Sequence, residues 1–213
     1  MVTAVISDIH GEFERLQKVM TQLNGIKPED VYVLGDMIQW GTSFPENRCL
    51  ELIRQRGFNA IGGNHEDLSL KMRKILKDEK KRSIMETSIW PENIKYLEGL
   101  APYMSKNGFM FAHMIPPNTG IRISNLDHAK VAFDYLSESH PDVQVCFVAH
   151  YHNPICFYYD PKKAKYGEEC RQQFRLHPER KYIINPGSVG KRETGSFLFF
   201  EPSTKTVQRG ALS

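Results

Sequence analysis

The segment TAVISDIHG, residues 3–11, places a short apolar run directly before a cluster of polar residues and a glycine. Thr3–Ile6 has the pattern of a buried strand. Apolar residues then recur at helical spacing from Phe13 to Leu23. The strand therefore leads through a polar turn into a helix, which is the first part of a strand–helix–strand unit.

The same alternation continues over the first sixty residues. Val31–Leu34 and Phe58–Ile61 have the pattern of two further buried strands. Between them, Pro45 begins a second helix that stops at Gly57. This order predicts a parallel sheet covered by helices, and hence an α/β protein.

The rest of the chain has a different pattern. A charged helical lobe is expected at about residues 66–104, a helix near Asp127–Ser137, and a mobile hairpin or loop over the polar stretch Asp160–Lys181. The later apolar runs predict strands at Phe109–Ala112, Val143–Val148, Ile155–Tyr159, Tyr182–Ile184 and Phe197–Phe200. The whole chain, 1–213, is expected to form a single domain.

Composition excludes several classes of protein. The net charge of +3 is small for 213 residues, so stable nucleic-acid binding is not expected. No apolar run is long enough for a membrane span, and the first residues lack the layout of a signal peptide. The four cysteines show no CxxC spacing and are expected to be reduced thiols in a cytoplasmic protein. The oligomeric state stays open.

Polar residues gather where the predicted strands end. The carboxyl ends of strands in an α/β sheet form one ligand-binding edge, so these groups are expected to converge. In Asp-x-His and His-x-His, the middle residue of an extended chain points away from the other two. The polar groups lie in Ser7–Gly11, Gly35-Asp36, Gly62–Glu66, His113 and His150–His152.

Seven of these residues form a mixed nitrogen and oxygen ligand set that suits Mn, Fe, Zn, Co or Ni. A lone histidine is more often structural, but five of the eight histidines fall in this one pattern. Seven ligands suit two ions that share a carboxylate. His128, His140 and His177 lie outside the pattern and are expected to be ordinary surface residues. The predicted ligands are Asp8, His10, Asp36, Asn64, His113, His150 and His152.

The order Asp-x-His, Gly-Asp, Gly-Asn-His-Glu, His and His-x-His resembles the calcineurin-like metallophosphoesterases. It extends from Asp8 to His152, and Ile184–Gly190 resembles a motif of the small bacterial and archaeal phosphodiesterase branch. The resemblance implies a four-layer α/β/β/α sandwich of two mixed sheets flanked by helices. It also implies two divalent metal ions, with manganese favoured.

The resemblance implies a role for each matching position. Asp8, His10 and His152 would bind the first metal, and Asn64, His113 and His150 the second. Asp36 would bridge the two. His65 would not be a ligand; it would contact the phosphate and act as the acid for the leaving oxygen, with an acidic neighbour as a candidate to orient it. A metal-bound hydroxide would be the nucleophile.

The sequence also departs from the family pattern. Protein phosphatases of the family carry arginines where this chain has Met37–Gly41 and Gly62-Gly63. Because a phosphomonoester dianion benefits from such arginines more than a diester does, a small phosphodiester substrate is expected. Tyr151 replaces the usual threonine of Gly-His-Thr-His and is expected to reshape the mouth of the pocket.

Several alternatives remain open. The same site would also suit a phosphomonoesterase or a dinucleoside-polyphosphate hydrolase, and the fold itself can serve as a non-catalytic interaction module. Trp40, Phe44 and Tyr151 adjoin the metal motifs and could stack a nucleobase, although loop packing explains them more simply. Arg122, Lys191 and Arg192 could bind further phosphate charge, although solvent-facing charge is the simpler reading of each.

Overall fold

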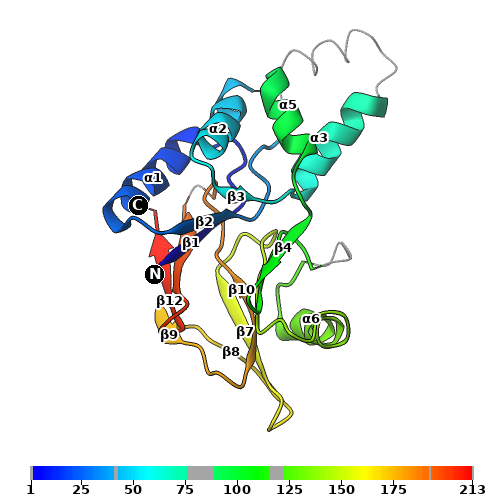
Figure 1. Cartoon of the computed structure of the whole chain (residues 1–213), viewed down its shortest axis with the longest axis vertical. Coiled ribbons are helices and arrows are strands. Elements are labelled where there is room, and N and C mark those ends of the chain that lie inside the picture. Colours follow the sequence, from blue (N-terminus) through cyan, green and yellow to red (C-terminus); the bar gives the residue numbers. More distant parts are fainter. Residues whose placement is uncertain (1, 41–42, 76–88, 116–121, 192, 213) are drawn as a thin grey trace.

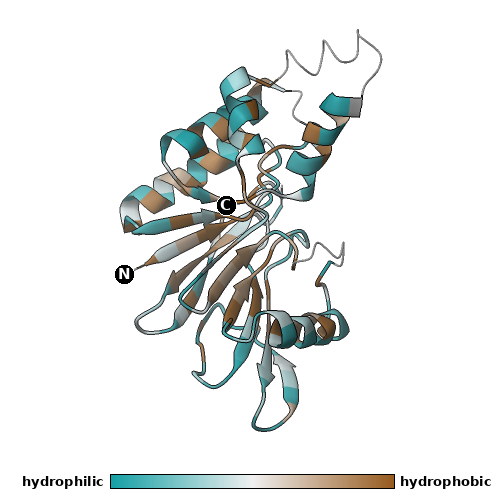
Figure 2. Cartoon of the chain, turned by 45° about the vertical axis from the view of Figure 1, so that its right-hand side comes forward, coloured by the Kyte–Doolittle hydropathy of each residue, from teal (hydrophilic) through white to brown (hydrophobic). Residues whose placement is uncertain are grey.

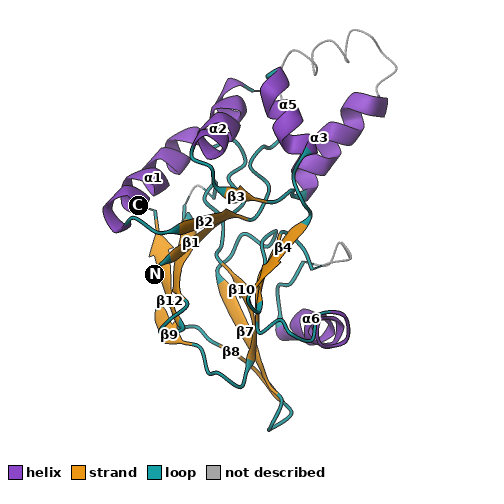
Figure 3. Ribbon diagram, in the orientation of Figure 1, coloured by secondary structure: helices purple, strands orange, loops and turns teal. Residues whose placement is uncertain are grey.

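The structure is a computed structural model that describes residues 2–40, 43–75, 89–115, 122–191 and 193–212. Two six-stranded mixed sheets lie face to face, and helices cover their outer faces (Figure 1). Figure 3 shows the helices outside the strands on both sides. The four-layer α/β/β/α architecture that the family resemblance implies is therefore confirmed.

The first sheet has the strand order β3-β2-β1-β11-β12-β9. β1, β2 and β3 are parallel, with Ala4 opposite Val31 and Val33 opposite Ala60, and the other pairs are antiparallel. The strands are β1 (Thr3–Ile6), β2 (Asp30–Val33), β3 (Asn59–Ala60), β9 (Gln173–Arg175), β11 (Ser196–Glu201) and β12 (Thr206–Ala211).

The second sheet has the order β4-β5-β6-β10-β7-β8. β5, β6 and β10 are parallel, with Met110 opposite Cys146 and Cys146 opposite Ile183. β4, β7 and β8 add antiparallel strands at the sides. The strands are β4 (Tyr103–Lys106), β5 (Phe109–Ala112), β6 (Val145–Phe147), β7 (Ile155–Asp160), β8 (Lys165–Glu168) and β10 (Lys181–Asn185).

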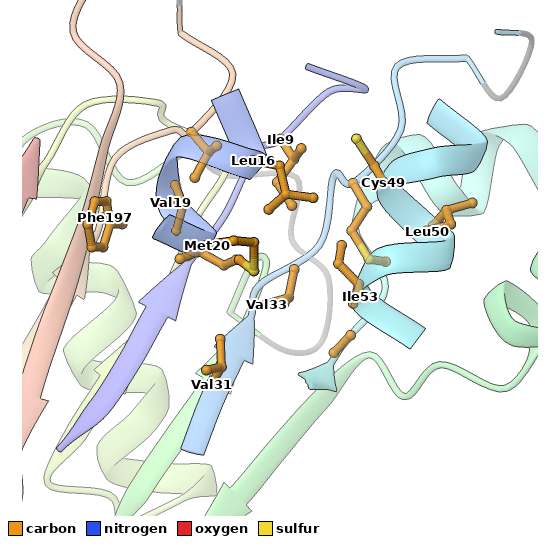
Figure 4. Packing of buried hydrophobic residues seen from close by; sticks show 14 of the residues in the cluster. Ile9, Leu16, Val19, Met20, Val31, Val33, Cys49, Leu50, Ile53 and Phe197 are labelled. Carbon is orange, nitrogen blue, oxygen red and sulfur yellow. The ribbon is translucent and has the colours of Figure 1, made fainter. Parts of the chain in front are cut away.

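Helices bury their apolar faces against the two sheets. The described helices are α1 (Phe13–Ile26), α2 (Phe44–Gln55), α3 (Asn64–Ile75), α5 (Pro91–Glu98) and α6 (Leu126–Ser139). α1 and α2 cover the first sheet, and α6 covers the second (Figure 1). The close-up in Figure 4 shows Leu16 and Met20 of α1 and Ile53 of α2 around Val33 of β2.

A third apolar layer lies between the sheets, where Phe147, Leu198 and Phe200 are almost fully buried. Hydrophobic residues accordingly line the strands, and the outer helix faces are hydrophilic (Figure 2). Burial of this area is the main force that fixes the two sheets against each other. The parallel strands then end at the same edge, and the metal-ligand candidates follow them there.

The predicted strands and helices are present with small shifts at their ends, but four strands had no predicted range, namely β4, β8, β9 and β12. Of the two alternatives predicted for Asp160–Lys181, the structure contains a hairpin rather than a plain loop. β8 pairs with β7 in a hairpin, and β9 joins the other sheet. Within the described residues, no helix is long and apolar enough to cross a membrane.

The single domain and the helical lobe at about residues 66–104 stay predictions. α3 and α5 fall in that range and contact each other, but residues 76–88 lie outside the described residues.

Candidate metal centre

Two loops at the ends of β1 and β2 are bonded to each other through their main chains. The N–H groups of Asp8, His10 and Gly11 donate to the carbonyls of Gly35, Asp36 and Met37 at 3.1, 2.9 and 2.9 Å. This ladder holds Asp8, His10 and Asp36 on one edge.

Five of the seven predicted ligands have a positive φ, which L-residues adopt at a cost. The angle is 50° at Asp8, 51° at His10, 50° at Asp36, 69° at His150 and 64° at His152. Backbone strain of this kind tends to cluster at functional sites.

The first group of candidate ligands comprises Asp8, His10, Asp36 and His152, whose ligand atoms lie within 4.8 Å of one another. His152 Nε2 lies 3.3 Å from Asp8 Oδ1 and 3.1 Å from His10 Nε2. Burial lowers the pKa of His10, although Asp36 and Asp8 oppose the shift. His10 is therefore held as the neutral imidazole, which is the form that binds metals.

The second group comprises Asp36, His113 and His150, and Asn64 joins it. His113 Nε2 lies 3.2 Å from Asp36 Oδ2 and 2.9 Å from Asn64 Oδ1. The Nδ1–H of His113 donates to the carbonyl of Leu34 at 2.7 Å. Because a carbonyl only accepts, this bond fixes the tautomer and directs Nε2 into the site.

Asp36 belongs to both groups and is almost completely buried. Burial alone would raise its pKa, but the hydrogen bond and charge of His113 and the N–H of His65 lower the pKa to about 2. Burial would likewise lower the pKa of His113, but Asp36 raises it to about 9. Asp36 is thus an anion between two sets of donors.

The residues fit a pair of divalent ions. Asp8 Oδ2 and His10 Nδ1 are buried and have no hydrogen-bond partner among the described residues. A buried carboxylate oxygen without a partner is costly unless a cation compensates it. The imidazole, carboxylate and amide donors suit borderline divalent metals.

Glu66 was part of the predicted motif but had no assigned role. It is buried and accepts hydrogen bonds from the N–H groups of Asp36, Met37, Ile38 and Gly63. Burial and the nearby Asp36 raise its pKa to about 7, whereas the N–H donors of Ile38 and Gly63 act in the opposite direction. Glu66 therefore joins the loops that follow β2 and β3.

Gly63 explains why two glycines precede Asn64. A Cβ atom on Gly63 would lie 2.3 Å from Asp36 Oδ1 and 2.5 Å from its N atom. These distances are far below van der Waals contact, so any side chain there would displace the central carboxylate.

The segment Asn185–Gly190 connects ligand loops of the two sheets. Ser188 Oγ and Gly190 N both donate to the carbonyl of Asp8, at 2.8 and 2.9 Å. Asn185 Nδ2 donates to the carbonyl of Ala149 at 2.8 Å, directly before His150. The sequence motif thus has a physical function, which is to fix the loops that carry Asp8 and His150.

His65 begins the first turn of α3 and is part of neither ligand group. Its N–H donates to Asp36 Oδ1 at 3.0 Å, and its Nε2 lies 3.9 Å from Asp36 Oδ2. Its Nδ1 faces the carbonyl of Gln39, so a main-chain oxygen and not the neighbouring acid Glu66 orients the ring. This corrects the expectation of an acidic orienting residue.

None of the other described candidates is part of a ligand group. The Trp40 ring lies 5.7 Å from the His65 ring, and Phe44 is exposed at the start of α2. Lys191 Nζ donates to Asn153 Oδ1 at 2.6 Å, and Arg192 lies outside the described residues. His128, His140 and His177 belong to neither ligand group.

Comparisons with known proteins agree with this geometry. A family model described as calcineurin-like phosphoesterase matches residues 1–184. A protein of uncharacterized function from Methanocaldococcus jannaschii is 27% identical over 202 residues, which cover 90% of this chain and 77% of the relative. The solved structure of a metallophosphoesterase from Sphaerobacter thermophilus superposes with a TM-score of 0.76 and 25% identity, covering 100% of this chain and 89% of that one.

A shorter match involves serine/threonine-protein phosphatase 1 of Salmonella typhimurium. It is 37% identical over 71 residues, which are 32% of this chain and 32% of the relative.

Proposed function

Because the chain belongs to the calcineurin-like phosphoesterase family, we propose that it is a dinuclear metal-dependent phosphodiesterase. Hydrolysis of a phosphoester is the family's activity, and the preference for diesters is our inference. The observation that carries the proposal is Asp36, a buried carboxylate common to two groups of ligand atoms and adjacent to His65.

In this proposal, Asp8, His10 and His152 hold one ion, and Asn64, His113 and His150 hold the other. Asp36 would contact both. Bound divalent ions supply Lewis-acid activation of the phosphoester and of water. Several metals suit this donor set, and manganese is favoured only by the resemblance to the family.

His65 is proposed as the general acid. Its Nδ1–H is directed to the carbonyl of Gln39, so the imidazolium would carry its transferable proton on Nε2. That atom lies beside Asp36, where the phosphate would bind. Donation of this proton to the leaving oxygen would stabilise the developing alkoxide.

The loop after Asp36 supports a diester substrate. Met37 and Ile38 are fully buried, and their N–H groups are bonded to Glu66. This loop therefore directs apolar side chains into the protein and offers no arginine to grip a dianionic monoester. A diester carries less charge and depends less on such a grip.

A comparison of three substrates tests the proposal. kcat/KM is measured with Mn²⁺ for bis(p-nitrophenyl) phosphate, p-nitrophenyl phosphate and a phosphoserine peptide, with chelator-treated protein as the control. We expect the diester to be the best substrate. A preference for the peptide, or for the monoester by about tenfold, would contradict the diester proposal.

A phosphomonoesterase is the second candidate, and the segment similar to a serine/threonine phosphatase favours it. Comparable rates on both nitrophenyl esters would support it. Dinucleoside-polyphosphate hydrolysis belongs in the same screen. A non-catalytic interaction module would bind metal and hydrolyse none of these substrates. The four free cysteines support a reducing compartment, for which we propose the cytoplasm.

A further inference from the structure

A cleft of about 640 Å³ adjoins the candidate metal centre. Its lining includes the candidate ligand His10 and Gln39, whose carbonyl orients His65. Trp40, Phe44 and Arg48 also line it. The cleft is therefore continuous with the place where the phosphate would bind.

Two aromatic side chains in this cleft are unusually exposed. Trp40 is 55% exposed and Phe44 is 63% exposed. Large aromatic surfaces that remain in water beside a polar centre are typical of binding sites for flat groups. Tyr151 does not line the cleft, which separates it from the other two aromatic candidates.

A buried carboxylate fixes the position of both aromatic residues. Glu46 is 4% exposed and accepts hydrogen bonds from the N–H groups of Gln39, Trp40 and Ser43. It also forms a capping box with Ser43, which sets the start of α2 at Phe44. The main chain at Trp40 and Phe44 is therefore held by the core of the protein.

Arg48 packs against two of the aromatic rings that line the cleft. Its guanidinium lies 5.0 Å from the centre of the Phe13 ring and 5.9 Å from that of Phe44. These cation–π contacts keep a positive charge beside the Phe44 ring. Glu12 and Glu14 also line the cleft, so a flat group would be bound there by ring surface rather than by net positive charge.

The position of Trp40 indicates which part of a substrate enters the cleft. Its ring is tilted by 56° to the His65 ring, with 5.7 Å between their centres. His65 would donate its proton to the leaving oxygen, so the group attached to that oxygen lies beyond His65. Trp40, whose ring adjoins that of His65, and Phe44 both line the cleft.

We propose that this cleft binds a nucleobase on the leaving-group side of the phosphoester, between Trp40 and Phe44. This inference rests on the proposed function and narrows its substrates to nucleotide esters. Every base offers a flat face, so stacking on these two rings would tolerate any base.

Binding tests the proposal without depending on turnover. Protein loaded with Mn²⁺ is titrated by calorimetry with AMP and with ribose 5-phosphate, which has the same phosphate and sugar but no base. Phosphate release is followed in parallel. We expect AMP to bind about 5- to 100-fold more tightly, the range that stacking of one base contributes.

Single substitutions test whether the affinity gained from the base depends on Trp40 and Phe44. Trp40→Ala and Phe44→Ala should each reduce the AMP to ribose 5-phosphate affinity ratio severalfold, and Trp40→Phe should keep most of it. Val131→Ala removes an equally exposed apolar side chain on α6 and is the matched control. In a Trp90→Phe background, Trp40 is the sole tryptophan, and AMP should quench its fluorescence while ribose 5-phosphate should not.

Equal affinities for the two ligands, or a ratio unchanged in both alanine variants, would overturn the proposal. Failure of the diester proposal is distinguishable from this outcome, because binding and quenching are measured whether or not a diester is hydrolysed. A protein that hydrolyses diesters yet binds both ligands equally would keep its proposed function and lose only the nucleobase site.

Discussion

The two groups of candidate ligands share Asp36 but differ in how the protein holds them. In the second group, His113 is 2% exposed and is fixed by the carbonyl of Leu34 and by Asn64. In the first group, His152 is 40% exposed, and its Nε2 faces the Nε2 of His10 at 3.1 Å. His113 is thus fixed by protein contacts, whereas His152 lies open to solvent.

A single metal centre can therefore contain one ion site whose ligands the protein fixes in advance and one whose ligands are ordered only by the ion. A ligand whose orientation is fixed in advance loses little entropy when it binds an ion. An exposed ligand must be ordered by the ion itself. We therefore expect the group with His113 to bind its ion more tightly than the group with His152.

Asp36→Asn should disrupt both groups of ligands, because both contain this carboxylate. We expect both ions to be lost and kcat/KM to fall by more than about 100-fold, beyond the loss typical of residues that only support a ligand. Metal content by mass spectrometry and the diester assay measure both effects. Asp67→Asn, an exposed acid three residues after Asn64, is the control. A variant that keeps both ions would refute the shared role of Asp36.

His113→Ala and His152→Ala should separate the two groups by stability. Without metal, removal of buried His113 leaves Asp36 without its charged partner, which costs about 3–5 kcal/mol of unfolding free energy. Removal of exposed His152 should cost within about 0.5 kcal/mol. Urea unfolding with a chelator present measures both values. Equal losses would mean that the second group is no better organised than the first.

His65→Ala tests whether a residue that contacts Asp36 without being a ligand affects metal binding. His65 touches Asp36 but belongs to neither group, so metal content should stay at the wild-type value. Turnover should fall by about 10²-fold or more, as expected for a general acid. Metal analysis and kcat on the diester are measured on the same sample. Loss of an ion from this variant would show that the assigned role is wrong.

Titration with a chelator should reveal the difference in affinity between the two ions, which is the smallest of the expected effects. As the chelator concentration rises, we expect one ion to leave at a concentration about tenfold lower than the other, an effect comparable with that of ligand-supporting contacts. In His152→Ala, only the tightly held ion should remain. Release of both ions in one step from the wild-type protein would count against an ordering of the two groups.

Much of the fold follows from local patterns. Apolar runs such as Thr3–Ile6 and Phe109–Ala112 coincide with strands, and the polar residues after them meet at one edge, as the rule for parallel strands predicts. β9 and β12 escaped prediction because they are short or mixed in polarity. They are strands through pairing with segments distant in the sequence.

The candidate ligands could be selected from the sequence because they follow predicted strands at regular spacing, and the structure brings them together. The residues that support them could not be selected in this way. Glu66, Glu46 and Ser188 act through hydrogen bonds to main-chain groups far along the chain or in a neighbouring loop. A sequence does not indicate which N–H a carboxylate will accept from. The nearest signal was the motif itself, because Glu66 and Ser188 both lie within stretches that resemble the family.

The positive φ angles of five candidate ligands have a consequence for protein engineering. Each such residue stores about 1–2 kcal/mol of conformational energy that glycine would release. Selection for thermal stability alone would therefore be expected to favour glycine at the partly exposed His150 and His152, whereas the buried pair with His113 opposes such a change at Asp36. A stabilised scaffold obtained in this way would keep the sandwich and lose its metals, so screens for robust variants need a metal-retention step.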